Sequence, residues 1–166
     1  MEAGAKASFS AVTDVRTRVV ILGSLPGEIS LQRRQYNANP TNQFWRLIGV
    51  VIEQDLVALD YPQRLEALLQ AGVGLWDVIK SAQRQGSGDG AIRRHQAHTL
   101  QEFADSLPQL NALAFNGQKS ASIGRRQLAP ARRHALLELP SSSAAYCSIG
   151  FDQKKAAWLR IRAFLT

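Results

Sequence analysis

The chain has 166 residues, 45% of them hydrophobic, which suits one domain with a single buried core and excludes a mainly disordered protein. Its 20 lysines and arginines outnumber 13 aspartates and glutamates, giving a net charge of +7. A basic domain of this size favours a polyanionic partner, most commonly nucleic acid, over a protein that is merely basic. The single cysteine, Cys147, excludes an internal disulfide and a cysteine-based metal cluster.

Two further absences in the sequence indicate where the protein works. No apolar run reaches the roughly 18 residues that a membrane span needs, and the first fifteen residues lack the apolar centre of a signal peptide. With one cysteine, these features predict a reducing, cytoplasmic location, at the DNA of a bacterial nucleoid if the partner is DNA.

The first half of the chain predicts one strand and two helices after a flexible segment over residues 1–17. Residues 18–22 are a β-branched run that ends at a Gly/Pro loop, as buried strands do. Residues 42–53 have helical apolar spacing, and Thr41 is placed to cap them. A second helix is expected from Pro62 to a terminating Gly72.

The second half predicts three more strands and three more helices. Residues 73–79, 110–115 and 134–139 have strand character, and residues 81–98 are expected to form a loop. Helices are expected over 99–107, over 119–128, and from Asp152, as its cap, to the end of the chain.

Helices between successive strands predict an α/β fold, a three-layer sandwich around a central, mostly parallel four-stranded sheet, as a single domain over residues 18–166. Ligands of such sheets bind at the carboxyl ends of the strands. All four predicted ends carry small or polar residues, so we expect a cleft there. These ends are 23–27, Asp77, Asn116-Gly117 and 140–143.

Two polar segments beside these elements have ordinary structural interpretations. Residues 23–27 lack both the lysine of a P-loop and the spacing of a dinucleotide-binding glycine motif, so a turn is the simplest reading. Residues 37–45 place three asparagines around the start of a helix, where asparagine usually caps the helix or forms a turn.

Taken together in chain order, however, several segments resemble the uracil-DNA glycosylase superfamily, and most closely its hypoxanthine (deoxyinosine) branch. They are Gly23-Ser24-x-Pro26-Gly27, Tyr36-x-Ala38-Asn39-Pro40-x-Asn42-x-Phe44-Trp45, residues 74–79, residues 86–92, Phe115-Asn116-Gly117 and residues 139–143. The resemblance covers residues 19–143 and is expected to include the last helix. It implies a DNA-repair enzyme of base excision that flips a deaminated base into a pocket, works as a monomer on DNA and needs no metal or organic cofactor.

The resemblance assigns the catalytic work to two asparagines. In mismatch-specific uracil enzymes an asparagine of the Gly/Pro loop positions water, but this chain has Leu25 there, which cannot do so. The deoxyinosine branch suggests Asn42 as the substitute, with a helix cap as its alternative role. Asn116 either reads the base or forms the turn before Gly117.

The remaining site residues are expected to bind the substrate. Asp77 stands where uracil enzymes have an asparagine and could accept a hydrogen bond from N1–H of hypoxanthine, and Tyr36 could stack on the flipped base although Asn37 replaces a usual aromatic. Serine hydroxyls and backbone amides suit phosphate contacts. The expected substrate-binding set is Gly23, Ser24, Leu25, Pro26, Tyr36, Asp77, Ser141, Ser142 and Ser143.

Two alternative functions stay open at this stage. One is a uracil or mismatch-specific glycosylase, and the other is a non-catalytic DNA-binding member of the superfamily, favoured by Leu25, Asn37 and the absence of an evident helix wedge among Ser143, Ala144, Ala145 and Tyr146. His95 and His98 are spaced like a pair of metal ligands, but no third ligand is evident, so we predict no metal site.

Overall fold

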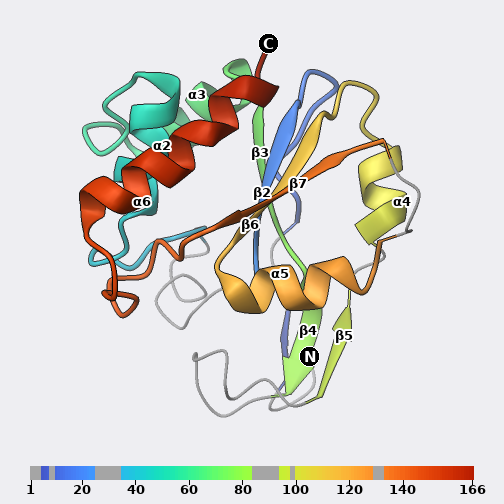
Figure 1. Ribbon diagram of the computed structural model, residues 1–166. Helices are drawn as coiled ribbons and strands as arrows, with labels where there is room; N and C mark the ends of the chain where they lie inside the picture. Colours follow the sequence, from blue (N-terminus) through green and yellow to red (C-terminus); the bar gives the residue numbers. More distant parts are fainter. Residues whose placement is uncertain (1–4, 8–9, 25–34, 84–93, 98–99, 129–132) are drawn as a thin grey trace.

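The centre of the computed structural model is a parallel four-stranded sheet in the order β3-β2-β6-β7 (Figure 1). Its strands are β2 (Val19–Gly23), β3 (Val73–Asp77), β6 (Ala112–Asn116) and β7 (Ala135–Leu139). The structure describes residues 5–7, 10–24, 35–83, 94–97, 100–128 and 133–166. The predicted α/β fold with a four-stranded parallel sheet is confirmed.

Helices cover both faces of this sheet and make three layers (Figure 1). One face packs against α2 (Phe44–Ile52), α3 (Tyr61–Gln70), α6 (Phe151–Trp158) and the 3-10 helix η2 (Leu159–Phe164). The other packs against α4 (Leu100–Asp105) and α5 (Gln118–Arg125). The chain crosses from β2 to β3 over the first face and returns to β6 and β7 over the second, as right-handed crossovers require.

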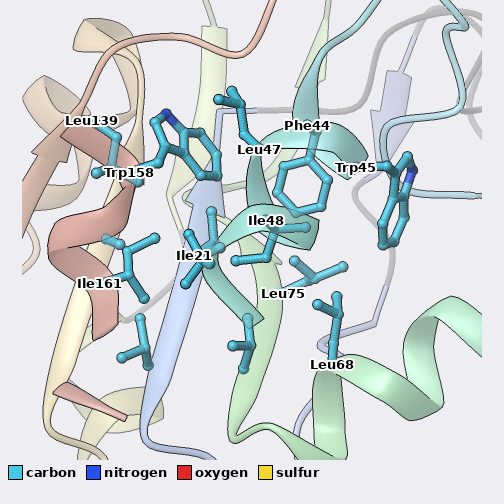
Figure 2. Close-up of a cluster of buried hydrophobic side chains, with 14 of the residues drawn as sticks. Ile21, Phe44, Trp45, Leu47, Ile48, Leu68, Leu75, Leu139, Trp158 and Ile161 are labelled. Carbon is cyan, nitrogen blue, oxygen red and sulfur yellow. The ribbon is translucent and has the colours of Figure 1, made fainter. Parts of the chain in front are cut away.

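Successive residues of β2 supply the two cores, because side chains of a strand alternate between faces. Val19 and Ile21 belong to the cluster under α2 and α6, and Val20 and Leu22 to the cluster under α4 and α5. Figure 2 shows the first cluster, in which Phe44, Leu47 and Ile48 of α2 pack with Trp158 of α6 over Ile21 and Leu75. Burial on both faces explains why β2 is apolar throughout.

Two predicted helix caps differ from the structure. Thr41 does not cap α2: its backbone N–H and its hydroxyl both donate to Asn39 Oδ1, at 3.0 and 2.8 Å, and Asn42 Oδ1 accepts from Phe44 N instead. Asp152 lies inside the first turn of α6, since the helix begins at Phe151 and Gly150 occupies the capping position. In both places several neighbouring polar residues could cap, and the path of the incoming chain selects among them.

A second sheet was not predicted. β1 (Ala5–Ala7), β4 (Ile79–Gln83) and β5 (Arg94–Ala97) form an antiparallel sheet in the order β1-β4-β5, so the predicted loop over 81–98 is partly strand. These strands are polar and lack an alternating apolar pattern, so only backbone pairing reveals them. Figure 1 shows this sheet beyond the carboxyl end of β3, near the amino terminus.

Part of the segment expected to be flexible, residues 1–17, is paired with the domain. Besides β1 pairing with β4, Val12 forms an antiparallel bridge with Leu75, with N–O distances of 2.9 and 3.0 Å. Val12 thereby supplies hydrogen-bond partners to backbone groups of β3, the edge strand of the sheet. Covering an edge strand in this way prevents it from pairing with another chain. No helix among the described residues is long and apolar enough to cross a bilayer.

Candidate active site

The carboxyl ends of the four strands lie along one edge of the sheet and bring the predicted polar residues together. The strand order places Asp77 at the end of β3, Gly23 at the end of β2 and Asn116 at the end of β6. The topological switch point lies between β2 and β6, whose crossovers leave in opposite directions. Because β2 lies between β3 and β6 and neighbouring strands are about 4.8 Å apart, the Cα atoms of Asp77 and Asn116 are separated by roughly 10 Å.

Gly23 is small for a reason that the register makes plain. It is the lateral partner of Asp77, and a Cβ at position 23 would lie 2.9 Å from Asp77 Oδ1. Asp77 is 3% exposed, so its carboxylate is held at the sheet edge against the Gly23 backbone and cannot easily move away. Ser24, which follows Gly23, is also buried.

A hydrogen-bonded network joins the two predicted catalytic asparagines through Ser142. The Ser142 hydroxyl donates to Asn42 Oδ1 at 2.7 Å and accepts from Asn116 Nδ2 at 2.9 Å. The backbone N–H of Ser142 donates to Asn116 Oδ1 at 2.9 Å. Ser142 is 1% exposed, so these bonds are shielded from water and stiffen one another. Ser142, which is distant from both asparagines in the sequence, thus fixes the side chains of Asn42 and Asn116 near the carboxyl ends of the strands.

The orientation of the Asn42 amide follows from its partners. Its Oδ1 accepts hydrogen bonds from Phe44 N at 2.9 Å and from the Ser142 hydroxyl. Because a backbone N–H can only donate, the atom of the amide that faces it must be the oxygen. Within the described part of the chain the Nδ2 end makes no hydrogen bond. Asn42 therefore does contribute to capping α2, and its two Nδ2 protons are still available to a water or a substrate.

The other two predicted serines shape the turn that carries Ser142. Ser141 Oγ accepts from Ser143 N at 3.1 Å, and Ser143 Oγ accepts from Ala145 N at 3.2 Å. Gly117 faces this turn with φ +96°, a left-handed conformation, and a Cβ there would lie 3.4 Å from Ser141 Cβ. Both hydroxyls thus serve the loop itself in the protein without DNA, and their expected phosphate contacts remain predictions.

Tyr36 lies mostly inside the first core cluster. It is 6% exposed, its hydroxyl donates to Ser10 O at 3.0 Å, and its backbone N–H donates to the Tyr61 hydroxyl at 3.0 Å. Burial raises the pKa of Tyr36 above its usual value, and the nearby Asp77 carboxylate and Tyr61 raise it further. Tyr36 is therefore neutral beside Asp77 at physiological pH, and stacking on a base remains a prediction.

Some predicted residues lie outside what the structure describes. Leu25 and Pro26 fall in the undescribed segment 25–34, and the side chains of His95 and His98 are likewise not described. Among the described residues there is no group of three or more histidines, cysteines, aspartates or glutamates that could hold a metal. The prediction that no metal or cofactor takes part is not tested by this.

Sequence reasoning missed the residues that support the network from α6. Lys154 Nζ donates to Gln43 Oε1 at 3.0 Å and to Ser143 O at 3.1 Å, and Trp158 Nε1 donates to Pro140 O at 3.0 Å. A lysine next to another lysine reads as an exposed helix face. Its spacing of four from the buried Trp158 was the available signal that Lys154 faces inward.

Open α/β sheets commonly bind ligands at such a switch point, where this chain places the polar site that contains Asn42 and Asn116. Comparison with known proteins shows to which family of such folds the chain belongs. The model of the uracil DNA glycosylase superfamily matches residues 9–162, so the chain belongs to this superfamily. A protein of Methanosarcina barkeri named hypoxanthine DNA glycosylase is 43% identical over 115 residues, 69% of this chain and 73% of its own length.

Two further matches come from Methanosarcina acetivorans. One, again named hypoxanthine DNA glycosylase, is 37% identical over 140 residues, covering 84% of this chain and 87% of its own. The other is the solution NMR structure of a "putative Uracil DNA glycosylase", with a TM-score of 0.82 at 33% identity over 97% of this chain and 98% of that one.

Proposed function

We propose that the protein is a monofunctional DNA glycosylase that hydrolyses the N-glycosidic bond of a flipped deaminated base, chiefly hypoxanthine. The observation that carries the proposal is the Asn42–Ser142–Asn116 network at the switch point of a superfamily fold, with Asn42 Nδ2 left to bind water or substrate. The names of the two Methanosarcina relatives support hypoxanthine as the base.

The proposed reaction needs a positioned water and stabilisation of the departing base. The water oxygen bonds to C1′ of the sugar as the bond between C1′ and the base breaks, and the base leaves with the bonding electrons. The proton that the water loses balances the proton that the base takes up, so the products are an abasic sugar with a hydroxyl at C1′ and the free base. Asn42 Nδ2 donates to the water oxygen and fixes its position, while Oδ1 stays tied to Phe44 N and Ser142. This arrangement gives the Asn42 side chain one orientation before substrate arrives, which lowers the cost of ordering it in the transition state.

Recognition of the base is assigned to the two flanking strand ends. Asp77 Oδ accepts from N1–H of hypoxanthine, a proton that adenine lacks, and the Asn116 amide meets the opposite side of the base. Asn116 is suited to this because both of its ends are already fixed by Ser142. A carboxylate at position 77 cannot donate to the carbonyl group beside the N–H in either hypoxanthine or uracil, so the preference for hypoxanthine is supported by the names of the relatives and tested by the incision assay.

The remaining partners follow from the proposed chemistry. DNA containing a deaminated base is the substrate. The protein acts as a monomer, in the cytoplasm, on nucleoid DNA. The rest of the binding surface consists of Gly23, Ser24, Leu25, Pro26, Tyr36, Ser141 and Ser143. The net charge of +7 supports attraction to the phosphate backbone.

An incision assay tests the function directly. Duplexes with a single deoxyinosine, deoxyuridine or deoxyxanthosine are incubated with the protein and then treated with alkali, which cleaves abasic sites. We expect cleavage chiefly at deoxyinosine, and the same cleavage in EDTA. Preferred cleavage at deoxyuridine would make the protein a uracil or mismatch-specific enzyme, and binding without cleavage would make it a non-catalytic member of the family.

A further inference from the structure

Lys154 is a buried cation that pairs with no carboxylate among the described residues. Its residue is 2% exposed, and Nζ contacts a side-chain amide oxygen of Gln43, the backbone oxygen of Ser143 and, at 5.5 Å from the ring centroid, the face of Tyr146. Among the ion pairs of the described residues none includes Lys154. Burying an ammonium group without a counter-ion is costly, and desolvation lowers the pKa of Lys154 accordingly.

The contacts of Lys154 connect two parts of the proposed site. Gln43 is the residue after Asn42, and its backbone N–H donates to Ser142 O at 2.8 Å. Ser143 is the residue after Ser142, whose hydroxyl donates to Asn42 at 2.7 Å. Lys154 therefore adds a third tie alongside these two, between the start of α2 and residues 140–146, which we call the serine loop.

α6 holds the serine loop at two points one helical turn apart. Trp158, four residues after Lys154, donates to Pro140 O at 3.0 Å and packs edge-on against Phe44 with ring centroids 5.7 Å apart. Lys154 and Trp158 thus each contact the serine loop, and each also contacts the start of α2: Lys154 through the N-cap residue Gln43 and Trp158 through Phe44, the first residue of the helix. The Trp158 anchor lies before Ser142 and the Lys154 anchor after it.

We propose that Lys154 is a positioning residue that clamps the serine loop to the start of α2 and thereby sets the Asn42–Ser142 contact on which excision depends. This rests on the proposed function. Lys154 does not act as a DNA ligand, because its side chain is buried. Lys155, the next residue, has 40% of its side chain exposed and pairs with Asp152 at 3.7 Å, so it offers a matched control that removes one exposed cation from the same helix.

The test compares Lys154→Met, which keeps most of the aliphatic stem, with Lys155→Met. We expect Lys154→Met to lower the single-turnover excision rate on deoxyinosine DNA ten- to a hundredfold, the order that small misplacement of a catalytic group causes, with little change in DNA affinity. Lys155→Met should excise at the parent rate and bind slightly more weakly in low salt. Equal rates for Lys154→Met and the parent would overturn the proposal.

A second pair of variants tests the other end of the clamp. Gln43→Ala removes the acceptor for Nζ, and Gln43→Glu keeps an oxygen in reach. We expect Gln43→Ala to lose rate, Gln43→Glu to recover it, and Gln43→Ala combined with Lys154→Met to lose little more than either alone, as residues acting in one contact do. These variants keep the proposal testable if Lys154→Met does not fold. Additive losses would refute a shared clamp.

Hydrogen exchange in the free protein separates this proposal from the proposed function. The Gln43 N–H, bonded to Ser142 O, and the Tyr146 N–H, bonded to Ser143 O at 3.1 Å, report on the clamp without any DNA. We expect faster exchange at both amides in Lys154→Met and parent exchange in Lys155→Met. If the parent does not excise hypoxanthine, the proposed function fails and the exchange result alone decides whether Lys154 clamps the loop; unchanged exchange would refute it.

Discussion

Two substitutions at Asn42 separate its capping role from its proposed catalytic role. In Asn42→Ala the Phe44 N–H and the Ser142 hydroxyl both lose the acceptor that they share in Oδ1. In Asn42→Asp the acceptor remains, and only the Nδ2 donors disappear. The two variants therefore differ in stability if the oxygen matters for folding, and agree in activity if the nitrogen matters for chemistry.

The expected stability losses follow from these two hydrogen bonds. Loss of a helix cap costs about 1 kcal/mol, and loss of a second, buried partner costs about 1 kcal/mol more. For a domain of 150–250 residues that sum of about 2 kcal/mol lowers the melting temperature by roughly 4–8 °C. Asn42→Asp should melt at or slightly above the parent temperature, because a carboxylate at a helix N-terminus is favourable.

The activity expectation is the same for both variants. Removing a preorganised donor typically costs on the order of 10²–10³ in rate, so single-turnover excision of hypoxanthine should fall by that factor in Asn42→Ala and in Asn42→Asp. The measurements are rapid-quench single-turnover rates beside thermal melting curves. An Asn42→Asp variant that excises at the parent rate would refute the role of Nδ2 and leave Asn42 as a cap, with Asp77 and Asn116 as the next candidates.

Three further predictions concern packing, DNA binding and pH. Gly23→Ala should lower both the melting temperature and the excision rate, because its Cβ would lie 2.9 Å from Asp77 Oδ1; unchanged melting would show that the carboxylate moves freely. The affinity for duplex DNA should fall with salt by a slope of about −0.9 for each phosphate contacted on a log–log plot, and a slope of zero would remove DNA as the partner. Because the pKa of Tyr36 is raised in the folded protein, its contribution to stability is present below the ordinary tyrosine pKa of 10.0 and is lost as pH rises above it. Denaturant titrations should therefore show a steeper alkaline loss of stability in the parent than in Tyr36→Phe.

Apolar patterns and the order of the elements along the chain predicted the central sheet, its helix layers and much of the candidate site. The β-branched run of β2 is apolar on both faces, and helices separate the strands, so a doubly covered parallel sheet was the consistent solution. Polar residues at the ends of three strands then had to share one edge, because parallel strands end on the same side. Local periodicity and chain order carry this information, so no tertiary contact was needed to predict it.

The contacts among those residues could not be predicted from the sequence, because they join distant parts of the chain. The Ser142–Asn42 bond joins residues one hundred positions apart, and the Lys154–Gln43 bond spans 111. The polar strands β1, β4 and β5 pair through backbone groups that leave no apolar pattern. The spacing of Lys154 from Trp158 indicates which face of α6 it shares, but its contact with Gln43 exists only once α6 packs against α2. Such contacts form only when whole helices and strands pack together. The interactions that stabilise them involve residues far away in the sequence, which the local sequence pattern does not specify.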